Sequence, residues 1–361
     1  MNDTNSESMS QESNYTLNRV QSSWYIVSRS DELKDAPLQV KLWGVAYVLY
    51  RNEKGVVCAL LDRCPHRNVP LSAGKCDQGK IRCGYHGWLF GDDGQCVEIP
   101  ALTPESPLPT VKTSAFPVIE AQGYIWIFPS EEEPQSKPFV FPYLDKENYV
   151  SIRYQTDFNA TVYCTAENIL DVPHTNVLHK GLFRKDQRKQ LDVQVSRYRD
   201  RVICEYLNES PPSGVVGKLL TRGASRVFHF DRFILPSIAE VEYSLESGQT
   251  LVTTSFLTPV SDFVTRMYTV VSLSKSIWTS MIGPAVRPMI MKIVQQDADM
   301  LKLLTETTRS FGEERFFHSR VDFLGPSIQS LMKKAAQKQI STLEDIESAE
   351  PDSVRTESFL A

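Results

Sequence analysis

Two short motifs constrain the fold of this chain more than any other feature of its 361 residues. Cys64 and His66 form a Cys-X-His pair, and Cys83 and His86 form a Cys-X-X-His pair further along. Each pair lies in an expected turn between short β-type runs. If the two turns face each other, they can present two sulfurs and two imidazoles to one metal centre. The sequence therefore predicts a small β domain with a metal site in its turns.

The order of these donors distinguishes between kinds of metal site. The common structural zinc finger places both cysteines before both histidines, whereas this chain interleaves them. Interleaving gives each turn one thiolate and one imidazole, as a [2Fe–2S] cluster needs when two Cys hold one iron and two His hold the other. A zinc-stabilised binding module is the alternative.

The segment spanning residues 24–128 resembles the Rieske [2Fe–2S] domain. Both motifs of that domain are filled, by Cys64, His66, Cys83 and His86. The resemblance implies an all-β domain in which these four residues bind the cluster.

Three positions depart from the respiratory-chain Rieske proteins. Those proteins add a clamp disulfide and a serine that hydrogen-bonds a cluster sulfide, and Val69, Tyr85 and Trp88 stand at the corresponding places here. Fewer hydrogen bonds leave the reduced cluster less stabilised, which predicts a low reduction potential. Such a donor suits oxygen activation.

Composition excludes several classes of partner and location. The net charge of −5 is spread along the chain, which argues against nucleic-acid binding. Residues 1–18 are polar and acidic and lack the pattern of a signal or transit peptide. Without a secretory signal, the seven cysteines are expected to be reduced thiols in a cytoplasmic protein.

The longest apolar stretch, residues 267–286, is interrupted by Lys275, Gly283 and Pro284. It predicts a buried strand followed by a loop, and membrane-surface contact is the less favoured alternative.

The pattern along the chain divides it into a β domain and a second, α+β domain. Hairpin turns are expected at residues 52–55 and 92–94. In the second domain we expect an antiparallel sheet, a helix over 166–178 interrupted near Pro173, and a long helix from 284–288 to Gly312. The predicted divisions are a tail (1–20), the β domain (21–130), a linker (131–145), the second domain (146–335) and an acidic, weakly ordered C-terminal tail (336–361).

A second group of candidate ligands lies in the segment ENILDVPHTNVLHK. His174 and His179 are five positions apart, and Asp171 comes three before the first. Five residues do not return to one helix face, so a kink or loosened turn after Pro173 is needed to bring the imidazoles together. Alone, such a pair is more often incidental, but a cluster upstream favours a second metal site.

This segment resembles the mononuclear-iron motif of Rieske non-haem iron oxygenases, which Glu167, Asn168, Asp171, His174 and His179 fill. The resemblance implies a helix-grip (START/SRPBCC-type) domain in which the two histidines bind Fe(II). It also implies that Asp171 and Asn168 are the candidate catalytic residues, with Asn168 near the iron but not ligating it and Glu167 tuning the site.

In the resembling family, the aspartate at the position of Asp171 bonds to an iron-ligand histidine and to a cluster-ligand histidine of a neighbouring chain. Carried over, the electron path runs from a neighbour's His86 through Asp171 to His174, within a head-to-tail homotrimer. A helix-capping role for Asp171 is the alternative.

The third iron ligand must come from elsewhere, and a late helix offers Asp297 and Asp299. Asp297 follows Ile293 by four positions and Val294 by three, so it shares their apolar stripe, whereas Asp299 points away. A carboxylate on a buried stripe is costly unless it is paired or metal-bound. We predict Asp297, and an ordinary ion pair with Arg or Lys is the alternative.

These motifs together predict an O2-dependent oxygenase with one [2Fe–2S] cluster and one Fe(II) per subunit. It would hydroxylate, dihydroxylate or demethylate an apolar, cyclic or aromatic small molecule. No flavin or nicotinamide motif is found, so a separate reductase, with or without a ferredoxin, is expected to supply electrons. The alternative is a Rieske electron carrier whose second domain binds a lipid-like ligand without catalysis. His229 and His318 are expected to be structural.

Overall fold

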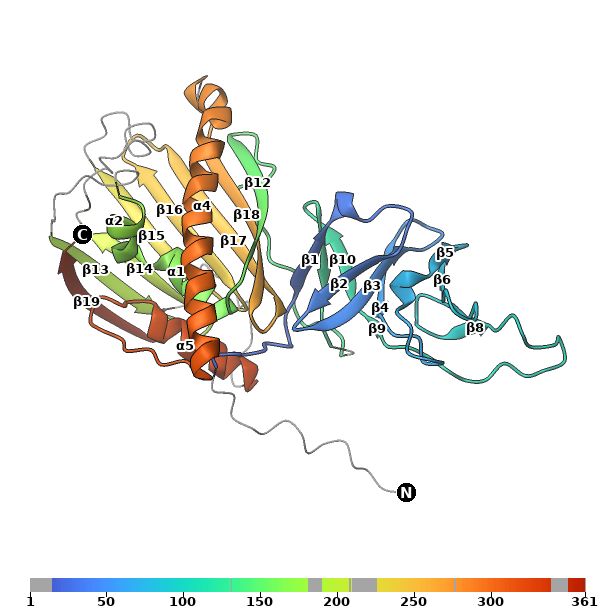
Figure 1. Ribbon diagram of the computed structural model, residues 1–361. Helices are drawn as coiled ribbons and strands as arrows, with labels where there is room; N and C mark the ends of the chain where they lie inside the picture. The colour runs from blue at the N-terminus through green and yellow to red at the C-terminus, as the bar shows by residue number, and fades with distance from the viewer. Residues whose placement is uncertain are drawn as a thin grey trace.

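A computed structural model shows a smaller β domain beside a larger α+β domain (Figure 1). It describes residues 15–130, 132–180, 190–207, 209, 226–275, 277–338 and 350–360, and for residues 277–287 and 289 the backbone only. Most of the expected N-terminal tail, residues 1–14, lies outside this range.

The front domain is built from antiparallel strands. Its elements are β1 (Tyr25–Arg29), η1 (Ser30–Glu32), β2 (Leu38–Leu42), β3 (Val45–Arg51), β4 (Val57–Leu61), η2 (Leu71–Ala73), β5 (Lys75–Asp77), β6 (Lys80–Arg82), β7 (Leu89–Phe90), β8 (Cys96–Glu98), β9 (Ala115–Phe116), β10 (Val118–Ala121) and β11 (Tyr124–Ile127). They form sheets of order β1-β11-β10, β2-β3-β4-β9 and β5-β6-β7-β8. The last of these lies at the end of the molecule away from the second domain (Figure 1).

The expected hairpin turns are confirmed. Asn52 and Gly55 connect β3 to β4, which pair antiparallel, and Gly55 has a φ of 76°. Gly94, with a φ of 78°, lies in the turn between β7 and β8. Glycine adopts this left-handed backbone without steric cost, which is why it stands at these turns.

The second domain is an 8-stranded antiparallel sheet of order β12-β18-β17-β16-β15-β14-β13-β19, with helices packed on one face (Figure 1). Its strands are β12 (Tyr149–Phe158), β13 (Gln190–Arg197), β14 (Arg201–Leu207), β15 (Val227–Ile234), β16 (Ile238–Leu245), β17 (Thr250–Ser261), β18 (Val264–Ser274) and β19 (Ser353–Leu360). Its helices are α1 (Val162–Leu170), α2 (Val172–Leu178), α4 (Ile277–Phe311) and α5 (Gly325–Ala336). The predicted fold class is therefore confirmed.

The long helix differs from the prediction at its start. α4 begins at Ile277, so Pro284 and Pro288 lie inside it, and the loop expected after β18 is helical up to Val286. A proline removes one intrahelical hydrogen bond but does not end a helix that tertiary contacts hold in place. The predicted end is confirmed, because Gly312 follows the helix with a φ of 77°.

Both chain ends contribute more structure than the sequence suggests. Arg19, placed in the N-terminal tail, forms a 2.8 Å ion pair with Asp262, and Val20 is only 1% exposed. The expectation of a weakly ordered C-terminal tail is wrong for residues 353–360, which pair along β13 as β19. Phe359 is buried there, and this apolar contact together with the strand pairing holds the segment on the sheet.

One apolar core joins the two domains. Trp126 of β11 packs on Phe256 of β17 with ring centroids 5.0 Å apart, and Tyr25 lies 6.0 Å from the same ring. The predicted linker, residues 131–145, contributes Phe141 to this core. The opposite face of the large sheet forms a separate core with α1, α4 and α5.

Within the described residues, no helix is long and apolar enough to cross a membrane.

Candidate metal centres

The two cluster loops have the same backbone geometry. In the first, the Cys64 N–H donates to Val69 O at 2.9 Å, and Asn68 N–H donates to Cys64 O at 2.8 Å. In the second, the Cys83 N–H donates to Trp88 O at 2.8 Å, and Gly87 N–H donates to Cys83 O at 3.1 Å. The fourth residue after each cysteine, Asn68 or Gly87, has a positive φ, of 63° and 74°.

The donors in these loops separate into a sulfur pair and a nitrogen pair. Cys64 and Cys83 are buried, at 1% and 4% exposure, and burial raises the pKa of the Cys64 thiol with a further contribution from Cys83. His86 is exposed and His66 is partly exposed, and their rings lie 4.6 Å apart. Two adjacent thiols and two adjacent imidazoles are the donor set of a Rieske cluster, so these residues fit it.

Close packing positions the loops. The Trp88 ring stacks on His66 at 4.5 Å with an interplanar angle of 6°. A Cβ on Gly74 would lie 2.0 Å from Arg82 O, so only glycine permits this approach of the backbone before Cys83. The sequence alone did not reveal this role of Gly74.

The candidate iron site begins where two helices meet at Asp171. Thr161 caps α1 by accepting the Cys164 N–H, and α1 ends at Leu170. Asp171 then caps α2, its side chain accepting the His174 N–H at 3.0 Å. The predicted interruption near Pro173 is therefore confirmed: it lies at Asp171, and Pro173 stands in the first turn of α2, where proline is well tolerated.

The end of α2 brings the two histidines together. His174 lies inside the helix, whereas His179 follows it with φ and ψ of −108° and 34°. Leaving the helical path corrects the angular mismatch of a five-residue spacing, and the two Nε2 atoms approach to 3.3 Å.

Asp297 of α4 completes a group of three ligand atoms that all lie within 4.8 Å of one another. Its Oδ1 is 3.0 Å from His179 Nε2 and 3.5 Å from His174 Nε2. The same oxygen is buried with no well-aligned hydrogen bond, as suits a metal ligand. Asp299 is exposed and accepts from Gln295 Nε2 at 2.8 Å, so it does not join the group.

Electrostatics in this group favour ionised Asp297 and protonated His174 before metal binds. Burial alone would raise the pKa of Asp297, but His174 and His179 outweigh burial and lower it. Burial alone would lower the pKa of His174, but Asp171 and Asp297 raise it to about 9. A metal ion must therefore displace a proton to bind His174.

The outer ring nitrogens of the two histidines are also held. His174 Nδ1 donates to the carbonyl oxygen of Asp171, and His179 Nδ1 lies 3.0 Å from Gln296 Oε1. Carbonyl oxygens only accept, so both Nδ1 atoms carry hydrogen and both Nε2 atoms can act as donors to a metal. Gln296 was not predicted in this role, although it stands next to Asp297 in the sequence.

The remaining predicted residues lie around this site. Asn168 is partly buried in the last turn of α1, and its carbonyl accepts the Asp171 N–H at 3.3 Å. Glu167 lines a small pocket together with Asp171 and Asp322. Burial raises the pKa of Glu167 to about 7, and those two carboxylates contribute. His318 is exposed and lies outside the metal sites.

Comparisons with known proteins agree with both sites. Residues 23–117 match the Rieske [2Fe–2S] domain, and residues 158–338, half of the chain, match the vanillate O-demethylase oxygenase C-terminal domain. The chain therefore belongs to the Rieske non-haem iron oxygenases, in the family defined by that C-terminal domain.

Individual relatives align over part of their length. The dicamba O-demethylase oxygenase component of Stenotrophomonas maltophilia is 31% identical over 49% of this chain and 52% of its own. The chloroacetanilide N-alkylformylase oxygenase component of Rhizorhabdus wittichii is 31% identical over 58% of this chain and 62% of its own. The chain thus spans about half to three fifths of the length of these relatives.

Solved structures share the fold over nearly the whole chain. Dicamba monooxygenase bound to dicamba superposes with a TM-score of 0.74 at 22% identity, covering 89% of this chain and 99% of that one. NdmA of Pseudomonas putida CBB5 with caffeine has a TM-score of 0.72 at 19% identity, covering 91% and 98%.

The predicted cofactors are confirmed for this chain. The front domain matches a [2Fe–2S] domain, and the second domain brings together His174, His179 and Asp297, a group that could hold a metal ion. The assignment of individual ligands to these cofactors is developed as a proposal below.

Proposed function

We propose that this chain is the oxygenase component of a Rieske-type system that uses O2 to hydroxylate, dihydroxylate or demethylate an apolar ring compound. The observation that carries the proposal is the convergence of His174, His179 and Asp297 in the chain that also holds the cluster motifs. An electron carrier needs only a cluster, whereas two histidines and one carboxylate with open positions are typical of non-haem iron oxygenases.

In this proposal, Cys64, His66, Cys83 and His86 hold the cluster. When bound, the cluster supplies single electrons and the iron supplies oxygen activation.

At the iron site, Asp171 and Gln296 hold the His174 and His179 rings so that both Nε2 atoms face Asp297. Fixed rings keep the ligands in place while substrate enters. His179 is only 2% exposed, which keeps bulk water from that side of the site.

Electrons must pass between copies of the chain. Figure 1 places the β5–β8 sheet, which borders the cluster loops, and helix α2 at opposite ends of the molecule. Since tunnelling falls steeply with distance, we infer that the cluster of one copy serves the iron of another in a head-to-tail homotrimer. His86 is exposed and the Asp171 side chain is 23% exposed, so the two can meet across a subunit boundary.

A separate reductase, with or without a ferredoxin, would deliver the electrons. The sequence offers no flavin or nicotinamide motif, and the relatives named above are described as oxygenase components. Their names point to ring compounds such as dicamba, which supports an aromatic substrate class. The cytoplasmic location stays a prediction.

Iron counting separates this proposal from its alternatives. The anaerobically purified protein should contain three irons per chain and show a Rieske electron paramagnetic resonance signal. His179→Ala should lose one iron and all O2-dependent turnover but keep the cluster signal. Two irons in the wild type would instead identify an electron carrier, and a colourless zinc protein would identify a binding module.

Mixed assemblies test the path between subunits. Cys83→Ser chains would lack the cluster, and Asp297→Asn chains would lack the mononuclear iron. Neither variant should turn over alone, but mixing them under conditions that exchange subunits should restore part of the activity. Electron transfer within one chain would leave the mixture inactive.

A further inference from the structure

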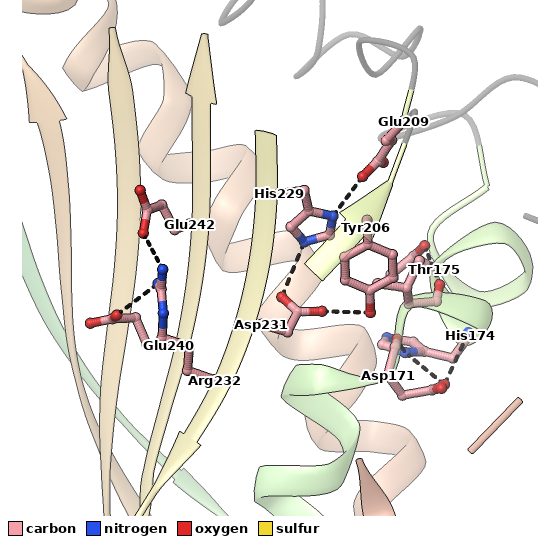
Figure 2. Close-up of polar contacts among 11 residues, drawn as sticks. Asp171, His174, Thr175, Tyr206, Glu209, His229, Asp231, Arg232, Glu240 and Glu242 are labelled. Carbon is pink, nitrogen blue, oxygen red and sulfur yellow. Dashed lines mark hydrogen bonds and ion pairs between the residues drawn. The ribbon is translucent and has the colours of Figure 1, made fainter. Parts of the chain in front are cut away.

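A buried histidine outside both metal sites has a polar partner at each ring nitrogen and a stacked tyrosine on each ring face. His229 of β15 is 1% exposed, with Nδ1 2.6 Å from Glu209 Oε2 and Nε2 3.1 Å from Asp231 Oδ1 (Figure 2). Its two ring faces stack on Tyr206 and Tyr243, with centroids 4.2 Å and 4.1 Å away. The sequence predicted only a structural role for this residue.

The partners of His229 require it to be a cation. Carboxylate oxygens only accept hydrogen bonds, so both ring nitrogens must carry hydrogen. Burial alone would lower the pKa of His229, but Asp231 and Glu209 raise it to about 9. A charged imidazole between two tyrosine rings is further held by cation–π attraction.

This group lies on the face of the sheet that the helices cover. Along β15, His229 and Phe233 point to one face and Arg232 to the other. Phe233 belongs to the core formed with α1, whereas Arg232 pairs with Glu240 and Glu242 at 3.1 Å and 2.7 Å (Figure 2). His229 and its stacked tyrosines therefore face the same side as the iron-site helices.

Among the described residues, the side chains of the covered face beside His229 are not fully buried. Tyr243 of β16 lies opposite His229, and its own neighbour across β17 is Leu251. Tyr243, Leu251, Val241 and Thr253 share this face and are all partly exposed. Side chains that face helices yet keep contact with solvent do not form a closed core, and mostly apolar side chains in such a place suit contact with a small organic ligand.

The covered face of the sheet also extends to the candidate iron site. Ile152 and Tyr154 of β12 point to the covered face and are partly exposed. Strand β12 contacts α4, the helix that carries Asp297, and Tyr154 packs against the core that contains Val294 of the same helix. Leu273 of β18, which pairs with Leu251 and with Val150 of β12, is also partly exposed, so one row of partly exposed side chains runs from Tyr243 to β12, whereas Val271 on the next row is buried.

Resting on the function proposed above, we propose that Tyr243 is a specificity-determining residue that contacts an aromatic ring of the substrate, and that His229 is the positioning residue that fixes Tyr243. A ring that is already fixed needs no ordering when the ligand binds. Aromatic rings gain from offset or edge-to-face contact with one another, which a saturated ring lacks. The Tyr243 ring, held by His229, thus selects flat rings over saturated rings of equal size.

Calorimetry on the anaerobic, iron-loaded holoenzyme tests this selection. The probes are three matched pairs: benzoate and cyclohexanecarboxylate, benzamide and cyclohexanecarboxamide, and anisole and methoxycyclohexane. The wild type should bind at least one aromatic member about three- to tenfold more tightly than its saturated counterpart. Tyr243→Phe keeps the ring and should keep this ratio, whereas Tyr243→Leu should bring it close to one.

His229→Asn tests the positioning role. It should lower the same ratio toward that of Tyr243→Leu while the cluster signal and the iron content stay unchanged. Phe228→Leu is the matched control, because Phe228 is 40% exposed on the opposite face of β15. This control should leave the ratio at the wild-type value.

The outcomes separate this inference from the proposed function. A preference that survives Tyr243→Leu, or a wild type that favours no aromatic probe, overturns the inference while three irons per chain still support an oxygenase. Unchanged selectivity in folded His229→Asn overturns the positioning role. A wild type with two irons contradicts the proposed function itself.

Discussion

The two metal sites of this chain are built in different ways. The cluster site comes from one continuous segment, residues 64–88, whose two loops close with the same pair of backbone hydrogen bonds. The iron site joins α2 to Asp297 of α4, which is remote in sequence, and its histidines are oriented by Asp171 and Gln296. The first site depends on local loop geometry, whereas the second depends on how α4 packs against the sheet.

The largest expected effect separates the two sites completely. Asp297→Asn removes the anionic ligand, so the mononuclear iron should be lost and turnover should fall by at least about a thousandfold. The cluster signal should stay at the wild-type level. Asp299→Asn, a change two positions away on the exposed face, serves as the control and should keep three irons per chain. Iron retention by Asp297→Asn would show that the carboxylate is not a ligand.

The converse change damages the cluster loops alone. Gly74→Ala places a Cβ 2.0 Å from Arg82 O, so the loops must shift. We expect a loss of about 3 kcal/mol in the free energy of unfolding of the front domain, and loss of the cluster absorption. The mononuclear iron should remain. Gly248→Ala has no atom within 4 Å of the new Cβ and should cost only about 1 kcal/mol, from its positive φ.

A smaller effect is expected from the residue that orients His179. Gln296→Leu removes the acceptor for Nδ1, so the affinity for Fe(II) should fall by about 10- to 100-fold. Gln296→Glu keeps an acceptor and should bind iron close to normally. Fe(II) titration of the metal-depleted protein measures both. If Gln296→Leu binds Fe(II) as tightly as the wild type, Gln296 does not orient the His179 ring.

The smallest effect concerns the acidic cavity beside Asp171. The folded-state pKa of Glu167 is about 7 and the ordinary value is 4.5, so this carboxyl destabilises the fold as the pH rises through that interval. Glu167→Gln should therefore gain stability over the wild type, by about 1 to 3 kcal/mol, between pH 5 and pH 8. Thermal unfolding across this range measures the difference. Glu147→Gln, a change at an exposed residue, is the control, and its stability should follow that of the wild type across the same pH range.

Much of this arrangement could be predicted from sequence patterns. The interleaved cysteines and histidines predicted the cluster domain, and the apolar stripe that includes Val294 favoured Asp297 over Asp299. Both inferences rest on spacings of a few residues, and local backbone geometry alone determines which side chains such spacings bring to one turn or one helix face. The proposed ligand roles remain predictions that the variants above can test.

Other features were missed or misplaced. The start of α4 was set at the prolines because local rules disfavour helix there, but the helix begins at Ile277 and includes both prolines. The acidic C-terminal segment was expected to be weakly ordered, yet pairing with β13 makes it a strand. For β19, a partner distant in sequence decided the outcome.

The sequence by itself determined which atoms are available to the metals, because donor type and local spacing follow directly from the order of residues. Only the tertiary structure decided that His179 leaves its helix to meet His174, that Gln296 holds its ring, and that His229 is charged between two carboxylates. These features depend on distances between segments that only the packed fold brings together, and burial there gives each contact its strength.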